Sequence, residues 1–131
     1  MIGLDTNILV RLVVADDVDQ SQRAQRFVDE NCTRETPAFI NCVVIAELVW
    51  VLARSYGYSH TQIVDVIASL LDGDDRVVEH RDAVIASLED YKTGKYEFVD
   101  AFILHINGQN GCTTTATFDR KAARNPGYLP I

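Results

Sequence analysis

The sequence predicts an α/β fold in which helices cover both faces of a central parallel sheet. Short apolar or β-branched runs alternate with longer segments of helical spacing, a pattern typical of parallel sheets with connecting helices. The chain has 131 residues, of which 47% are hydrophobic, so it can form one domain, residues 1–131, with a full core. Asp5 and Asp119 follow predicted strands, where an open parallel sheet collects its ligands.

The first predicted strand passes into a helix at Asp5. Residues 2–4 are short and apolar, as a buried strand should be, and residues 7–13 show helical apolar spacing. Asp17 can cap a second helix, in which the expected apolar stripe consists of Ala24, Phe27 and Val28.

The middle of the chain is predicted to hold two helices between two short strands. Pro37 opens a strand at residues 38–40, where its missing N–H does little harm. The apolar run over residues 43–53 is too long for a typical strand, so we expect a mostly buried helix ending before Gly57. Ser59 and Gln62 have capping-box form and start the next helix, whose expected apolar face is Ile63, Val66, Ile67, Leu70 and Leu71.

The last third begins with a strand around Val77 and Val78, followed by a helix over residues 82–91. A polar break at residues 92–95 separates that helix from one over residues 98–107, which carries Asp100 in its first turn. Residues 113–117 are rich in threonine and read as a strand. Asp119 then opens a short helix that Pro126 and Gly127 terminate.

The composition limits the classes of protein to consider. A formal charge of -7 argues against a general nucleic-acid-binding module, although an enzyme whose acids are masked by a metal ion stays open. No apolar run approaches the roughly 18 residues of a membrane span, so we expect a soluble, cytoplasmic protein. An odd number of cysteines without a C-x-x-C pair indicates free thiols: Cys32, Cys42 and Cys112.

Four separated acids are the main functional candidates: Asp5, Glu47, Asp100 and Asp119. Taken alone, Asp5 and Asp119 could be simple N-caps, and Asp100 gains about 0.3–1 kcal/mol from its helix dipole. Glu47 has no capping role, and the alternative for it is an ion pair with Arg54 or a more distant base.

Considered together, the acids favour a metal site. Two carboxylates about 4 Å apart repel by roughly 4 kcal/mol at an effective dielectric of 20, and a divalent cation removes that penalty. Oxygen ligands favour Mg²⁺ or Mn²⁺ over zinc, because the sequence places no cysteine or histidine pair nearby. The histidines, His60, His80 and His105, look isolated.

Four short motifs resemble the PIN-domain nuclease family, and most of all its single-domain VapC-type toxins: Leu4-Asp5-Thr6-Asn7, Ile45-Ala46-Glu47-Leu48, Val99-Asp100-Ala101 and Thr117-Phe118-Asp119-Arg120. Their order and spacing match over essentially the whole chain. The resemblance implies a three-layer α/β/α PIN-like fold, metal-dependent RNA cleavage, a homodimer and a small antitoxin as partner. It makes the four acids the metal-binding and catalytic quartet, with Thr6, Asn7 and Thr117 as polar supports.

Two positions depart from the family pattern. Many relatives carry Asp three residues before the third acid, where this chain has the longer Glu97, which could reach a metal only through a shifted geometry or a water. Asn41 stands where Ser is common.

Our sequence-based mechanism places a Mg²⁺ or Mn²⁺ ion on Asp5 and Asp119, with Asp100 and Glu47 completing its shell directly or through water. Basic residues near the last two acids would steer RNA phosphates, or be ordinary solvated charges: Lys92, Lys95, Arg120, Lys121 and Arg124.

Rival functions belong to other classes. A receiver-like phosphoacceptor would need adjacent acids after the first strand, but Thr6 follows Asp5. A haloacid-dehalogenase-like phosphatase would need Asp where Asn7 stands. A non-catalytic metal-binding or partner-binding module is the remaining alternative.

Overall fold

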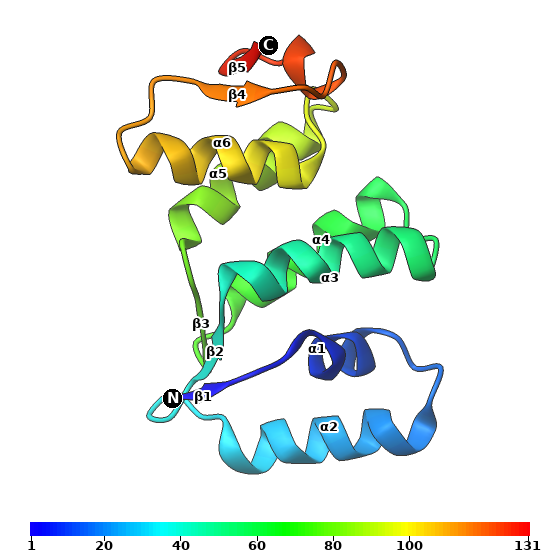
Figure 1. The fold of residues 1–131 in the computed structure, drawn as a ribbon. Helices are drawn as coiled ribbons and strands as arrows, with labels where there is room; N and C mark the ends of the chain where they lie inside the picture. The colour runs from blue at the N-terminus through cyan, green and yellow to red at the C-terminus, as the bar shows by residue number, and fades with distance from the viewer. The chain divides into compact units, whose positions relative to one another are not determined.

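The computed structural model describes all residues, 1–131, and contains six α-helices and two parallel sheets. The chain divides into two compact units, an N-terminal unit of Met1–Arg81 and a C-terminal unit of Asp82–Ile131 (Figure 1). The N-terminal unit contains β1 (Ile2–Gly3), α1 (Thr6–Val13), α2 (Val18–Asn31), β2 (Ala38–Ile40), α3 (Cys42–Ser55), α4 (His60–Asp72) and β3 (Arg76–Val78). The C-terminal unit contains α6 (Phe98–Gln109), β4 (Thr115–Thr117), the 3₁₀ turn η1 (Ala122–Arg124), β5 (Tyr128–Pro130) and nearly all of α5 (Arg81–Lys92).

The sheet of the N-terminal unit has the strand order β1-β2-β3, with all strands parallel. Ile2 pairs with Ala38, and Ile40 pairs with Val78, so the carboxyl ends of β2 and β3 are level. Helix α1 lies between α2 and α3 and packs against both (Figure 1). The apolar side chains that bury most completely in this unit are Leu9, Ile40, Ile45, Leu48, Leu52, Ile63 and Ile67.

Side-chain caps start the four helices of the N-terminal unit, as the sequence predicts for three of them. Asp5 caps α1 and Asp17 caps α2, each by accepting a backbone N–H. Ser59 and Gln62 form the expected capping box of α4. Asn41 caps α3 by accepting the N–H of Val44 at 2.9 Å, so it supplies locally the oxygen that a serine would supply.

The C-terminal unit pairs β4 with β5 in parallel, from Thr115 opposite Tyr128 to Thr117 opposite Pro130. Its core contains three buried aromatic rings, in which Phe98 contacts Tyr91 edge-on at 6.1 Å between centroids and Phe102 at 5.7 Å.

Three sequence-based expectations for this unit were wrong. The strand β4 begins at Thr115 rather than at residue 113, and the turn after Asp119 is one 3₁₀ turn rather than a short α-helix. Strand β5 was missed, because three residues ending in Pro130 give no alternating pattern. Gly127, with φ of 99°, turns the chain into it.

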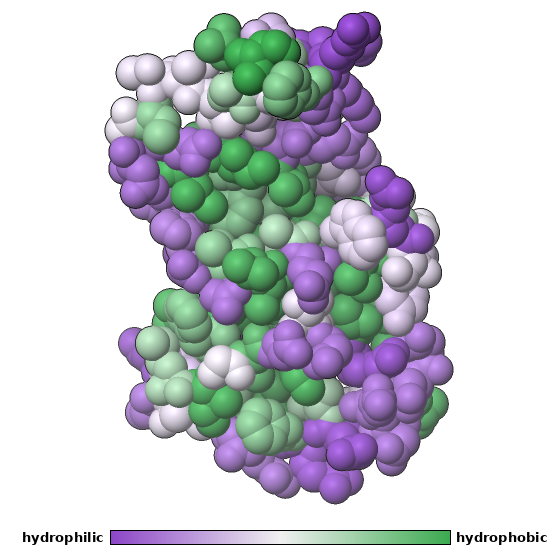
Figure 2. Space-filling model, viewed as in Figure 1, coloured by the Kyte–Doolittle hydropathy of each residue, from purple (hydrophilic) through white to green (hydrophobic).

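The apolar stripe expected on α2 is only partly buried. Ala24 is buried, but Phe27 is 43% exposed. Figure 2 shows hydrophobic and hydrophilic residues interspersed on the face drawn there. No helix has the length and apolar character to cross a membrane.

Candidate functional site

The N-terminal unit brings two of the four predicted acids to one pocket. Asp5 and Glu47 are both solvent-exposed, and we call them the N-terminal acidic pair. Their pocket has a volume of about 240 Å³, and its other lining residues are Thr6, Asn7, Val10, Arg11, Val51 and Tyr56. The two carboxylates are 42 residues apart in sequence, and the packing of α1 against α3 brings them together.

Local structure orients the two carboxylates differently. Asp5 follows β1, and its Oδ1 accepts the backbone N–H of Thr6 at 2.7 Å, which fixes the carboxylate at the start of α1. Glu47 lies in the middle of α3 and accepts no hydrogen bond, so both of its oxygens are available to a ligand. The predicted polar supports differ in exposure, since Thr6 is 5% exposed and Asn7 is exposed.

Arg11 is the basic side chain of this pocket, and sequence reasoning did not consider it. Its Nη1 forms an ion pair with Asp16 at 2.6 Å, and its Nε donates to Gln20 at 2.6 Å. The alternative of an ion pair between Glu47 and Arg54 is not realised. Arg11 is therefore held by other partners, and Glu47 has no basic partner.

The C-terminal unit gathers three more acids, Glu97, Asp100 and Asp119, which we call the C-terminal acidic cluster. The pKa of the half-buried Asp100 is raised, chiefly because burial penalises its charged form and further because of the charges of Asp119 and Glu97. Lys121 opposes this shift. The side chain of Asp100 accepts no hydrogen bond, so its ionised form is poorly compensated.

The other two members of the cluster are held by specific contacts. Oδ1 of Asp119 accepts the backbone N–H groups of Lys121 at 2.8 Å and Ala122 at 3.1 Å. Thr117 Oγ1 accepts the N–H of Asp119 at 2.9 Å, a contact that suits its expected supporting place. Glu97 Oε1 pairs with Lys121 Nζ at 3.2 Å at an exposed position.

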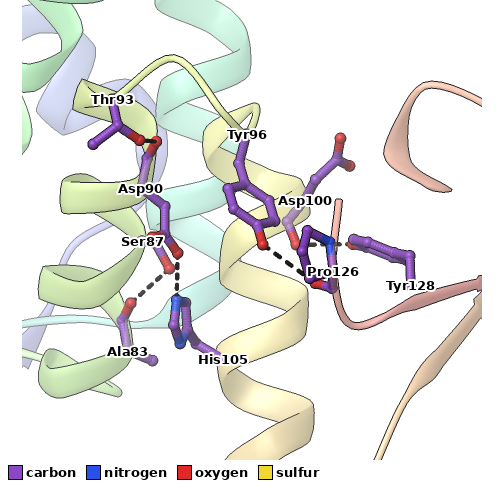
Figure 3. Close-up of polar contacts among 9 residues, drawn as sticks. All are labelled: Ala83, Ser87, Asp90, Thr93, Tyr96, Asp100, His105, Pro126 and Tyr128. Atoms are coloured by element: carbon purple, nitrogen blue, oxygen red, sulfur yellow. Dashed lines mark hydrogen bonds and ion pairs between the residues drawn. The ribbon is translucent and has the colours of Figure 1, made fainter. Parts of the chain in front are cut away.

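Tyr128 belongs beside this cluster, and sequence reasoning missed it. Its hydroxyl donates to the backbone oxygen of Asp100 at 2.8 Å (Figure 3). Burial, together with the charges of Asp100 and Asp119, raises the pKa of Tyr128 to about 12. The only signal that could have found it was strand β5, which the sequence pattern conceals.

The sequence suggested isolated histidines, but His105 and His80 each lie close to a carboxylate. His105 Nε2 lies 2.7 Å from Asp90 Oδ2 (Figure 3), because α5 and α6 place these side chains opposite each other. His80 Nε2 lies 3.4 Å from Glu79 Oε1.

The predicted RNA-binding residues all belong to the C-terminal unit and are all exposed. Lys92 pairs with Glu89 at 3.1 Å, and Lys121 pairs with Glu97. Lys95, Arg120 and Arg124 form no ion pair, so their charges are open to other partners.

The donor set of the two acidic groups suits a hard divalent cation. The groups offer carboxylate oxygens, which Mg²⁺ and Mn²⁺ prefer. Burial, and then the like charges of Asp119 and Glu97, raise the pKa of Asp100. A bound cation would relieve that repulsion.

The family model of the PIN domain matches residues 2–128, which covers both units. A comparison with curated proteins gave no match. The match, the six helices and the parallel strand pairing together show the three-layer α/β/α PIN-like fold. The carboxylates that the two units gather lie at the positions of the motifs that resemble this family, and the chain therefore belongs to the PIN-domain family, whose fold is that of metal-dependent nucleases.

Proposed function

We propose that this protein is a divalent-metal-dependent endoribonuclease and the VapC-type toxin of a toxin-antitoxin pair. The proposed metal-binding and catalytic residues are Asp5, Glu47, Asp100 and Asp119, with Glu97 as an accessory acid. The observation that carries the proposal is the poorly compensated charge of the carboxylates: Glu47 has no basic partner, and the half-buried Asp100 lies near the like charges of Asp119 and Glu97. Because the family match covers both units, we propose that residues 1–131 act as one PIN domain.

The four acids contribute in two ways. Asp5 and Asp119 each use Oδ1 to accept backbone N–H groups, so their carboxylates are oriented before any ligand arrives. Glu47 and Asp100 keep their oxygens free. A bound Mg²⁺ or Mn²⁺ would supply charge stabilisation to the phosphodiester and lower the pKa of an attacking water.

The uncommitted basic residues offer a way to attract RNA to an acidic protein. Lys95 and Arg120 are exposed, form no ion pair and flank the C-terminal acidic cluster in sequence. Phosphate contacts make binding depend on salt, so neutralising both residues should weaken RNA affinity and reduce the salt slope by about 2. RNA affinity is best measured in a variant that cannot cleave RNA. An affinity at low salt that does not change when both residues are neutralised would contradict this role.

The VapC assignment also implies partners and a location. We propose a cytoplasmic homodimer that a small antitoxin inhibits. A short upstream reading frame encoding a DNA-binding protein, whose product restores growth when both are expressed, would support the toxin role. Size-exclusion chromatography of the free chain tests the dimer separately.

The decisive experiment is cleavage of single-stranded RNA by the purified chain with Mn²⁺, Mg²⁺ or EDTA. We expect cleavage that EDTA abolishes, and a loss of at least about 100-fold in rate for Asp5→Asn and for Asp100→Asn. If both residues serve one reaction, the double variant should be little slower than either single variant, because groups that act as a unit are not additive. Asp74→Asn, which removes an exposed carboxylate of the α4–β3 loop, is the matched control and should retain full activity.

Three outcomes would overturn the proposal or part of it. Cleavage that ignores EDTA excludes the metal-dependent mechanism. An Asp5→Asn variant that stays fully active with normal metal dependence excludes the role assigned to Asp5. Metal-dependent stabilisation without cleavage of any tested RNA would instead favour the non-catalytic metal-binding module.

A further inference from the structure

A third group of metal-ligating side chains lies in the N-terminal unit and includes neither member of the acidic pair. Cys42, Glu79 and His80 each offer one ligand atom, and these atoms lie within 4.8 Å of one another. All three residues are half-buried. The PIN motifs use none of them.

The parallel register of β2 and β3 brings these residues together. Ile40 pairs with Val78, and the ladder continues with the N–H of Glu79 donating to the oxygen of Ile40 at 2.9 Å. Cys42 and Glu79 therefore follow level strand ends, although 37 residues separate them. The carboxyl end of a parallel sheet is where such folds bind ligands.

Specific contacts already link the three residues. Glu79 Oε2 accepts the backbone N–H of Cys42 at 3.1 Å, and Glu79 Oε1 lies 3.4 Å from His80 Nε2. His80 is the one non-glycine residue with positive φ, at 53°. That left-handed backbone is uncommon for a residue other than glycine, and it occurs here where the imidazole lies close to Glu79.

The ligand types identify the class of ion. A thiolate, an imidazole and a carboxylate together suit Zn²⁺ or a similar borderline ion rather than Mg²⁺. Bond lengths of about 2.0–2.3 Å put the ligands of a tetrahedral ion roughly 3.5 Å apart. Glu79 Oε1 and His80 Nε2 already lie 3.4 Å apart, and the other ligand atoms, all within 4.8 Å of one another, need only a small side-chain adjustment. Three protein ligands leave a fourth position for water or another group.

We propose that Cys42, Glu79 and His80 form a binding site for Zn²⁺ that is distinct from the PIN carboxylates. The ion ties the β2–α3 connection to the end of β3. Helix α3 also carries Glu47, so the ion fixes the helix that supports this member of the acidic pair.

Titration of the full chain with Co²⁺ tests the site, because a cobalt–thiolate bond gives near-ultraviolet charge-transfer absorption that carboxylate sites do not. We expect this absorption in the wild-type protein, its displacement by Zn²⁺ and a rise in Tm with Zn²⁺. Cys42→Ser should abolish the absorption. Cys112→Ser, which removes an exposed cysteine of the C-terminal unit, should leave it unchanged.

His80→Asn separates metal binding from folding, because asparagine tolerates the left-handed backbone that His80 adopts. With EDTA its Tm should match the wild type, while its Co²⁺ affinity should fall by more than the roughly 10–100-fold that outer-shell changes cost. Asp5→Asn should keep the absorption, so the result does not depend on nuclease activity. Absence of thiolate absorption in the wild type, its loss in Cys112→Ser or unchanged affinity in His80→Asn would overturn the proposal.

Discussion

Replacing Asp100 by asparagine should stabilise the metal-free protein while it destroys the proposed activity. The pKa of Asp100 is raised by burial and by the charges of Asp119 and Glu97. Folding therefore favours its protonated form, and at neutral pH the ionised carboxylate costs stability. Its side chain accepts no hydrogen bond that the substitution would break.

The size of the gain follows from the environment of the side chain. Asp100 keeps contact with solvent, which screens the repulsion, so we expect a gain of at most about 1 kcal/mol. Unfolding entropy of about 2.1 cal/mol/K per residue, over the 131 residues, converts this into a rise in Tm of up to about 4 °C.

The stability gained by Asp100→Asn should depend on pH. The folded-state pKa of Asp100 lies above its unfolded value, so its carboxyl group stabilises the fold less as the pH rises between those two values. The advantage of Asp100→Asn should therefore be absent at acidic pH and complete at neutral pH. Saturating Mn²⁺ should reverse the order, because the ion stabilises the wild-type carboxylate.

Urea unfolding with EDTA, at neutral pH and at the lowest pH where the protein stays folded, measures the effect. Asp74→Asn, whose carboxylate is exposed and unpaired, controls for the change in net charge. A lower stability of Asp100→Asn at neutral pH, or an equal gain at both pH values, would contradict a destabilising ionised carboxylate at Asp100.

Three further changes test single contacts. Asn41→Ala should cost about 1 kcal/mol in urea unfolding, because it removes the cap on Val44 N–H, and Asn41→Ser should recover most of it. An Asn41→Ala variant as stable as the wild type would show that the cap is unimportant. Leu48→Ala should cost about 2–5 kcal/mol, because Leu48 is 0% exposed, and a loss below 1 kcal/mol would mean that α3 packs loosely. Lys121→Ala should raise the pKa of Asp100 further, measured by carboxyl NMR with EDTA, and an unchanged pKa would contradict the charge interaction assigned to Lys121.

Local signals in the sequence predicted most helix starts, because a cap is a contact between near neighbours. Asp17 and Ser59 are examples, since each accepts an N–H three residues ahead. The capping of α1 by Asp5 was equally readable.

Contacts set by strand register could not be read in the same way. The sequence around Cys42 gives no signal for its contact with Glu79, because only the pairing of β2 with β3 brings the two residues within hydrogen-bonding distance. Tyr128 stayed hidden for a related reason: its strand is three residues long, and its partner Asp100 is 28 residues away.

The capping role of Asp5 and Asp119 affects which acids related sequences should retain. Both residues hold backbone N–H groups, so selection for folding alone can preserve them in a relative that lacks the proposed activity. Glu47 and Asp100 make no such structural contribution, and the repulsion around Asp100 favours its replacement once no metal is bound. In relatives that have lost the proposed activity, Asp5 and Asp119 should be retained longer than Glu47 and Asp100. Intact Glu47 and Asp100 are therefore better evidence of that activity than intact Asp5 and Asp119.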